Sequence, residues 1–125
     1  MIGYMTFGTN DLEKAGHFYD ALLEIIGAKR FMADEHIILW ATKPGAAMFS
    51  VITPHDGKTA TVGNGVMAAF AVDDLATVKS MHAKALELGG TDEGEPGPRG
   101  DDGLCFGYVR DLEGNKLAFY CMPQQ

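Results

Sequence analysis

Two stretches of the chain show the residue alternation of a β-strand, and each is followed by a helical pattern. Residues 3–8 place Tyr4 and Thr6 on one face and apolar side chains on the other. This period of two predicts a strand. Residues 65–72 carry the same kind of run, so we expect a second strand of the same type there.

After each of these strands, an apolar side chain recurs every three or four positions, which predicts an amphipathic helix. Asn10 or Asp11 caps the first helix, which ends at Gly27, and Asp73 or Asp74 caps the second. The apolar stripes consist of Ala15, Phe18, Tyr19, Leu22, Leu23 and Ile26 in the first helix and of Leu75, Val78, Met81, Ala85 and Leu88 in the second. Each helix is therefore expected to cover one face of a sheet.

Further strands are expected where short apolar runs lie between turn-forming residues. They cover residues 30–32, 37–41 and 46–53 in the first half and residues 104–110 and 116–121 in the second. The last two strands form a hairpin, whose turn over residues 111–115 requires Gly114 at positive φ. Residues 91–103, rich in glycine, proline and acidic side chains, are expected to form a loop.

The two halves look like copies of one module. Tyr4 matches Met67 and Asp11 matches Asp74, and both pairs (67 less 4, 74 less 11) give an offset of 63. Each copy contains a strand, a helix and a run of strands, so we predict an α+β fold of two βαβββ modules. We expect a single domain in which the first module spans residues 1–54, a connector spans residues 55–64 and the second module spans residues 65–125.

Composition and charge narrow the class of protein. The chain has 125 residues, of which 46% are hydrophobic, enough to bury a core. Its formal net charge of −7 argues against nucleic-acid partners, which need clustered cations. No long apolar run or signal peptide is present, so we expect a cytoplasmic protein that does not bind membranes. Cys105 and Cys121 lack metal-binding spacing and are expected to be reduced, small hydrophobic residues.

Short motifs follow one another in order along nearly the whole chain. They are Thr9-Asn10-Asp11-Leu12-Glu13-Lys14-Ala15, His17-Phe18-Tyr19, Gly63-Asn64-Gly65, Pro96-Gly97-Pro98-Arg99, and Tyr108-Val109-Arg110-Asp111 leading into Gly114-Asn115-Lys116. Their order and spacing resemble the vicinal oxygen chelate superfamily, which includes glyoxalase, bleomycin-resistance and extradiol dioxygenase proteins. The resemblance implies an incomplete, cup-shaped mixed β-barrel with the helices outside. It also implies a homodimer.

Metal-dependent members of this superfamily carry a His or Gln near the start of each module's first strand and a Glu near each module's last strand. By the resemblance, these four positions fall at Tyr4, Met67, Met48 and Ala118. None of these side chains is an ordinary ligand for a divalent metal ion. We therefore expect no metal and no other cofactor, with a divalent metal in a divergent ligand set as the alternative.

The four positions and their period-two neighbours are expected to line the cup. They are Tyr4, Thr6, Met48, Met67, Ala69, Ala118 and Tyr120. His36 and Trp40 share a strand face with Ile38, and we expect this face to belong to the cup as well, adding a titratable group and a stacking surface. The alternative is that all these residues fill a closed core.

Four other positions carry candidate polar chemistry. Arg99, in the predicted loop, would supply a cation for a ligand carboxylate or phenolate, and acidic neighbours compete for it. Those neighbours are Glu93, Glu95, Asp101 and Asp102. His17, His55 and His82 are expected at the surface of helices or of the connector.

Three functional hypotheses follow. The first is a protein that binds a small hydrophobic or aromatic molecule in the cup without a metal. The second is a glyoxalase-like lyase or isomerase of the lactoylglutathione lyase type, or a dioxygenase, with His36 and Tyr4 in a divergent metal site or with Tyr4 or Tyr120 as acid or base. The third is a structural or interaction module with a filled core.

Overall fold

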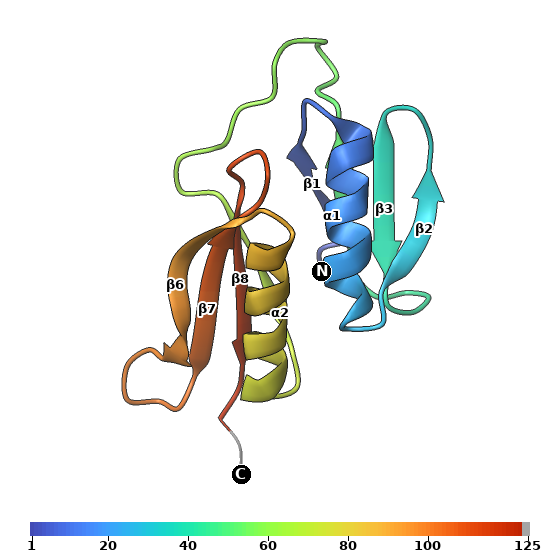
Figure 1. Cartoon of the computed structure of the whole chain (residues 1–125). Helices are drawn as coiled ribbons and strands as arrows, with labels where there is room; N and C mark the ends of the chain where they lie inside the picture. Colours follow the sequence, from blue (N-terminus) through green and yellow to red (C-terminus); the bar gives the residue numbers. More distant parts are fainter. Residues whose placement is uncertain (124–125) are drawn as a thin grey trace. The chain divides into compact units, whose positions relative to one another are not determined.

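The chain forms two βαβββ modules, each with one helix packed on a four-stranded sheet (Figure 1). The computed structural model describes residues 1–123. It divides into two compact units, the first covering Met1–Val62 and the second beginning at Gly63. The predicted α+β class and the repeated βαβββ module are confirmed.

The first module has the sheet order β1-β4-β3-β2. Its elements are β1 (Tyr4–Gly8), α1 (Leu12–Glu24), β2 (Lys29–Ala33), β3 (Ile37–Ala41) and β4 (Met48–Ile52). Strand β1 is parallel to β4, whereas the other neighbours are antiparallel, so the sheet is mixed and open. Helix α1 packs on one face of this sheet, against β2, β3 and β4.

The second module repeats this order as β5-β8-β7-β6. Its elements are β5 (Met67–Ala71), α2 (Leu75–Glu87), β6 (Thr91–Pro98), β7 (Cys105–Arg110) and β8 (Lys116–Cys121). Strand β5 is parallel to β8, and α2 packs against β6, β7 and β8. Both β5 and α2 begin and end 63 residues after β1 and α1 (67 less 4, 75 less 12), as the offset in the sequence predicts.

Each helix begins at the second of the two predicted cap residues. The Asp11 carboxylate accepts the Lys14 backbone N–H at 3.0 Å, and the Asp74 carboxylate accepts the Thr77 backbone N–H at 2.8 Å. These bonds satisfy amide groups that have no partner within the helix. The Thr77 hydroxyl and backbone N–H together lower the pKa of Asp74, which keeps this cap ionised.

One predicted element is wrong. Residues 91–98, predicted as part of a loop, form the edge strand β6, paired antiparallel with β7. The pairing shifts register between Asp92 and Gly94 and again between Gly94 and Gly97, so the strand is bulged. Bulges and an edge position let a strand contain Gly and Pro, and they erase the period of two on which the sequence prediction relied.

Each sheet has a helix face, covered by its own helix, and an open face on the other side. In the first module the helix face is rich in aromatic residues, with Trp40 and Phe49 packed against Tyr19 of α1 at ring-centroid distances of 5.7 and 4.7 Å. In the second module it holds the stacked rings of Phe70 and Phe119, at 6.1 Å between centroids, beside the aliphatic residues Val109 and Leu117, both fully buried. Neither helix of residues 1–123 is long and apolar enough to span a lipid bilayer.

Candidate functional site

The open face of the first sheet carries the predicted cup residues Tyr4, Thr6 and Met48. Tyr4 lies opposite Met48 in the β1–β4 register, and Thr6 lies opposite Ser50. Tyr4 is 56% exposed and Thr6 is exposed, whereas Ser50 is buried and its hydroxyl donates to the Met5 carbonyl at 2.8 Å. This face presents a phenol, a hydroxyl and a thioether.

Residue Trp40 does not lie on this face, so its predicted place in the cup is wrong. It is 1% exposed and packs under α1, and its indole N–H donates to the Asp20 carboxylate at 2.9 Å. The period of two correctly places Trp40 beside Ile38, but it does not say which side of the sheet the helix covers. Helix α1 covers the side of the sheet that carries Trp40.

His36 lies at one end of the first module, away from Tyr4. Its backbone carbonyl accepts a hydrogen bond from the backbone N–H of Thr53, just beyond β4. Tyr4, in contrast, pairs with Met48, where β4 begins. At about 3.3 Å per residue, the two positions are roughly 16 Å apart along the sheet. His36 and Tyr4 therefore do not combine in one site within this module.

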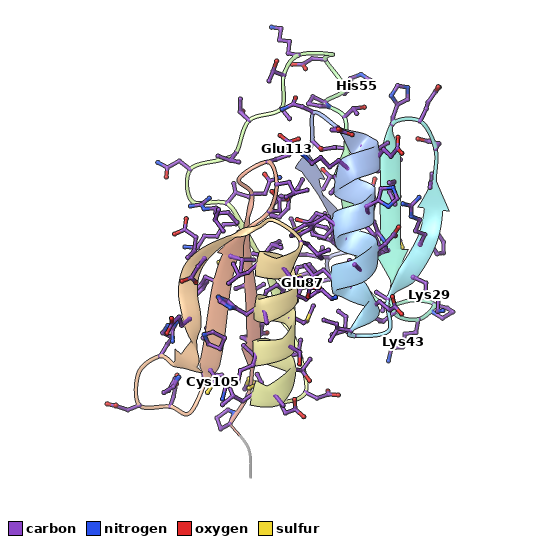
Figure 2. All side chains as sticks on the ribbon, viewed as in Figure 1. Lys29, Lys43, His55, Glu87, Cys105 and Glu113 are labelled. Atoms are coloured by element: carbon purple, nitrogen blue, oxygen red, sulfur yellow. The ribbon has the colours of Figure 1, made fainter. Side chains whose placement is uncertain are left out.

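His36 instead lines a cavity of about 710 Å³ at that end of the module. Its wall also includes Thr9, Asn10, His55 and Lys58. The His36 ring lies 3.3 Å from the Thr53 hydroxyl, and its side chain is 70% exposed. Figure 2 shows His55 on the segment that leaves this end of the module. The predicted surface positions of His55 and of His17, whose side chain is 76% exposed, are confirmed.

The four expected metal positions do not fit a divalent ion. In the register of the repeat, Ser50 in β4 corresponds to Ala118 in β8, because Thr6 pairs with Ser50 as Ala69 pairs with Ala118. The predicted slot at Met48 is therefore shifted by two residues. The corrected set of a phenol, a thioether, a hydroxyl and a methyl group lacks both imidazole and carboxylate. Among residues 1–123, no three His, Cys, Asp or Glu side chains are grouped to hold a metal ion.

The open face of the second sheet carries Met67, Ala69, Ala118 and Tyr120, all of them predicted cup residues. Ala69 lies opposite Ala118 in the β5–β8 register, and both Met67 and Ala69 are exposed. Ala118 is buried, so its methyl group adds little surface to this face. Tyr120 is partly exposed and belongs to a larger group of rings.

Three stacked rings dominate this open face, and two of them were missed in the sequence. Phe106 stacks on Tyr120 across the hairpin at 5.2 Å between ring centroids, with 15° between the ring planes. Along β7, Phe106 also stacks on Tyr108 at 5.7 Å and 6°. All three rings are partly exposed. The period of two along residues 104–110, combined with the hairpin turn, provides the signal that finds them.

Two cations flank the last ring of this row. The Lys116 ammonium lies 5.1 Å from the centroid of the Tyr108 ring, and the Arg99 guanidinium carbon lies 5.6 Å from it. These distances are within the range of cation–π contacts. Lys116 was not predicted as a site residue.

The contacts of Arg99 differ from those expected. Its guanidinium donates to the backbone carbonyls of Glu95, Gly97 and Pro98 at 2.6, 3.0 and 3.2 Å, and not to the acidic side chains nearby. Within residues 1–123, neither Arg99 nor Lys116 forms an ion pair. The open face therefore holds two uncompensated positive charges in a chain whose net charge is −7.

His82 lies on the other side of this sheet, and its predicted surface position is wrong. It is 6% exposed, and its Nε2 lies 3.0 Å from the Asp92 carboxylate of β6. The Gly94 backbone N–H and His82 together lower the pKa of Asp92. Since β6 was not predicted, its carboxylate partner for His82 was not predicted either.

Comparison with known proteins identifies this architecture. No protein-family model matches the chain, and no curated protein matches it in sequence. Among solved structures, a glyoxalase/bleomycin resistance protein from Albidiferax ferrireducens T118 is 35% identical to this chain, with a TM-score of 0.89. The superposition covers 98% of this chain and 99% of the Albidiferax chain.

More distant structures share the fold. A glyoxalase-related enzyme from Fulvimarina pelagi is 20% identical with a TM-score of 0.74, covering 97% of this chain and 87% of its own. Lactoylglutathione lyase from Agrobacterium tumefaciens is 21% identical with a TM-score of 0.68, covering 97% and 92%. Since the first of the three structures shares more than a third of its residues over nearly all of both chains, this chain belongs to the glyoxalase/bleomycin resistance protein family of the vicinal oxygen chelate superfamily.

Proposed function

We propose that the chain binds a small, planar aromatic acid on the open face of its second module and that binding requires no metal ion. The observation that carries this proposal is the row of three stacked rings next to two cations without carboxylate partners. Binding sites for small molecules commonly combine an apolar wall with a few polar groups that fix orientation.

The rings favour a flat ligand. Tyr120, Phe106 and Tyr108 lie nearly parallel, with 15° and 6° between successive planes, and are flanked on β5 by the small residues Ala69 and Ala71. A planar ligand gains stacking and apolar contact on such a surface. The small residues leave room at the side of the aromatic row.

The cations favour a negative group on that ligand. The Lys116 ammonium has no carboxylate partner within residues 1–123, and Arg99 makes hydrogen bonds to neutral carbonyl groups. A bound carboxylate would receive charge-assisted hydrogen bonds from groups already held in place over Tyr108. A neutral ligand would gain only the stacking contribution.

Isothermal titration calorimetry with 2-naphthoate tests this proposal. We expect saturable binding to the wild-type chain, weaker binding of the uncharged 2-naphthamide, and weaker binding of the non-aromatic cyclohexanecarboxylate. Lys116→Gln and Tyr108→Ala should each lower the affinity for 2-naphthoate about tenfold, because each removes one of the two kinds of contact.

Matched controls come from the first module. Phe31→Ala removes an aromatic ring that is 65% exposed on β2, and Lys29→Gln removes a cation from the same strand. Neither should change the affinity for 2-naphthoate. Equal losses in all four variants, or no binding by the wild-type chain, would overturn the proposed site.

The metal-free part of the proposal has its own test. The protein is purified without an affinity tag, incubated with Zn, Ni, Mn or Fe(II), desalted and analysed for metal. We expect no stoichiometric metal, because the four expected positions carry no ordinary ligand group. About one metal per chain or per pair of chains, together with 2-naphthoate binding that depends on it, would contradict this expectation and support the enzyme alternative.

A further inference from the structure

The two cysteines of the chain face each other on the helix face of the second sheet. Cys105 in β7 is the register partner of Cys121 in β8, and both are free thiols. Directly opposite residues of antiparallel strands point to the same side of a sheet, and their Cα atoms are about 4.5 or about 5.5 Å apart. Both separations lie within the range of about 4.4–6.8 Å that a disulfide spans.

The two thiols differ in access. Cys121 is buried at 2% exposure, whereas Cys105 is partly exposed at the start of β7, with its sulfur 3.9 Å from the Gly103 carbonyl. Figure 2 shows Cys105 at the end of the β6–β7 hairpin, beside the connecting loop. Burial, and the neighbouring Cys105, raise the pKa of Cys121. Cys105 is therefore the thiol that meets a reagent from solvent first, with Cys121 directly behind it.

We propose that Cys105 and Cys121 form an oxidisable dithiol site, which a hydroperoxide converts into an intramolecular disulfide. The proposal is independent of ligand binding, because both thiols lie on the helix face and the rings lie on the open face. It also modifies the prediction that both cysteines act only as small hydrophobic residues.

The chemistry takes two steps. The Cys105 sulfur attacks the outer oxygen of the hydroperoxide, forming an S–O bond and breaking the O–O bond, which gives a sulfenic acid and an alcohol, or water from hydrogen peroxide. The Cys121 sulfur then attacks the Cys105 sulfur, forming the S–S bond and breaking the S–O bond, and the hydroxyl group leaves as water with the Cys121 proton. The two thiols lose two electrons in total, and the peroxide gains them.

The position of the pair gives the disulfide a structural consequence. Each cysteine is one residue from a member of the stacked ring pair, since Phe106 follows Cys105 and Tyr120 precedes Cys121. A disulfide here would join β7 and β8 next to the rings that stack at 5.2 Å. It would hold together the two strands that carry the aromatic row.

Intact-protein mass spectrometry on the full chain provides the test, with hydrogen peroxide added in slight molar excess and the products alkylated without reducing agent. We expect the mass of the wild-type protein to fall by the mass of two hydrogen atoms, and neither cysteine to be alkylated. Treatment with dithiothreitol should restore both the original mass and the alkylation of both cysteines. Non-reducing electrophoresis should show the monomer, because the bond is intramolecular.

Two single variants separate the roles of the thiols. Cys121→Ser should stop at a sulfenic acid on Cys105, detected as an adduct with dimedone, and Cys105→Ser should react at least about tenfold more slowly. Addition of oxygen atoms to wild-type Cys105 without loss of the Cys121 thiol would overturn the proposal. Disulfide-linked dimers in place of the intramolecular bond would overturn it as well.

Discussion

The two modules share one backbone plan but distribute their aromatic residues differently over the two faces of the sheet. In the first module Phe7, Trp40 and Phe49 face the helix and are buried. In the second module the helix face keeps one stacked pair, Phe70 and Phe119, while Phe106 and Tyr108, with Tyr120, stack on the open face and stay partly exposed. Two modules with the same fold can therefore use the corresponding faces of their sheets for different purposes.

This difference assigns separate physical tasks to the modules. Aromatic rings packed under α1 remove a large apolar area from water and stabilise the first module. Rings stacked on the open face of the second module leave apolar area in contact with solvent, and two cations lie over the last ring. Under the proposed function, these partly exposed rings contact the ligand.

The largest expected effect is on the first module. Trp40→Ala removes a buried ring that contacts Tyr19 and Phe49, so we expect a loss of about 3–5 kcal/mol in the free energy of unfolding. Urea denaturation followed by circular dichroism measures it, since the variant has no tryptophan to report by fluorescence. Tyr108→Ala is the comparison. A greater loss of stability in Tyr108→Ala than in Trp40→Ala would contradict the view that the rings under α1, and not those on the open face of the second module, stabilise the protein.

The second module has a partly buried polar contact between α2 and β6. His82→Ala removes a side chain that is 8% exposed and bonded to Asp92 at 3.0 Å, and we expect a loss of about 1–3 kcal/mol in the same urea assay. His17→Ala, on the exposed surface of α1, should change stability by less than about 0.5 kcal/mol. Equal effects of the two histidine variants would show that the His82–Asp92 contact does not stabilise the module.

Much of the fold follows from the sequence because local patterns determine it. The offset of 63 residues fixes the first strand and the helix of each module, and aspartates at matched positions cap both helices. Gly114 takes the positive φ of 93° that its turn requires. Strand β6 could not be predicted, because its bulges and its Gly and Pro residues remove the alternation that marks a strand.

The site was only partly predictable, for two physical reasons. A period of two shows which residues share a face but not which face the helix covers, so Trp40 was placed on the wrong side. The row formed by Phe106 and Tyr108 could have been predicted, because the hairpin register follows from its turn and brings Phe106 opposite Tyr120. The partners of Arg99 depend on β6, which no local pattern revealed.

A pH titration sharpens the comparison at Asp20, which ties the first module's sheet to α1. Burial alone would raise the pKa of Asp20, but hydrogen bonds from Arg30 and Trp40 outweigh it and lower the pKa. A lowered pKa means stability that is present above the ordinary aspartate pKa and lost as the pH falls through the folded value. Asp20→Asn should therefore cost about 1 kcal/mol near neutral pH, a modest value because the carboxylate is 41% exposed.

The measurement is the unfolding free energy of both proteins between about pH 6 and pH 3. The difference between the wild type and Asp20→Asn should shrink as the pH falls, since protonation removes the charge that Arg30 and the Trp40 indole recognise. Asp34, Asp74 and Asp92 also have lowered pKa values, so both proteins lose stability in acid. A constant difference across this range would contradict the role given to the Asp20 charge.

The smallest expected effect on stability comes from Gly94→Ala, which acts on the open face alone. A Cβ at this position would lie 2.8 Å from Cδ2 of Tyr108 and 3.3 Å from the Arg99 guanidinium, so the ring and the cation must shift. Both are partly exposed, so we expect a loss of less than about 1 kcal/mol. Binding of 2-naphthoate should nevertheless weaken, because the stacked row and its cation no longer coincide.

Gly16→Ala provides the matched substitution in the first module. There the added Cβ would lie 2.8 Å from both Arg30 Nη2 and Ile38 Cδ1, under α1 on the helix face. Its displacement of Arg30 disturbs the pair with Asp20 and should lower stability, partly offset because alanine favours a helix more than glycine does, without changing 2-naphthoate affinity. If Gly94→Ala lowers stability as much as Gly16→Ala does and leaves binding unchanged, the rings of the second module belong to its core, and the contrast between the modules is one of packing alone.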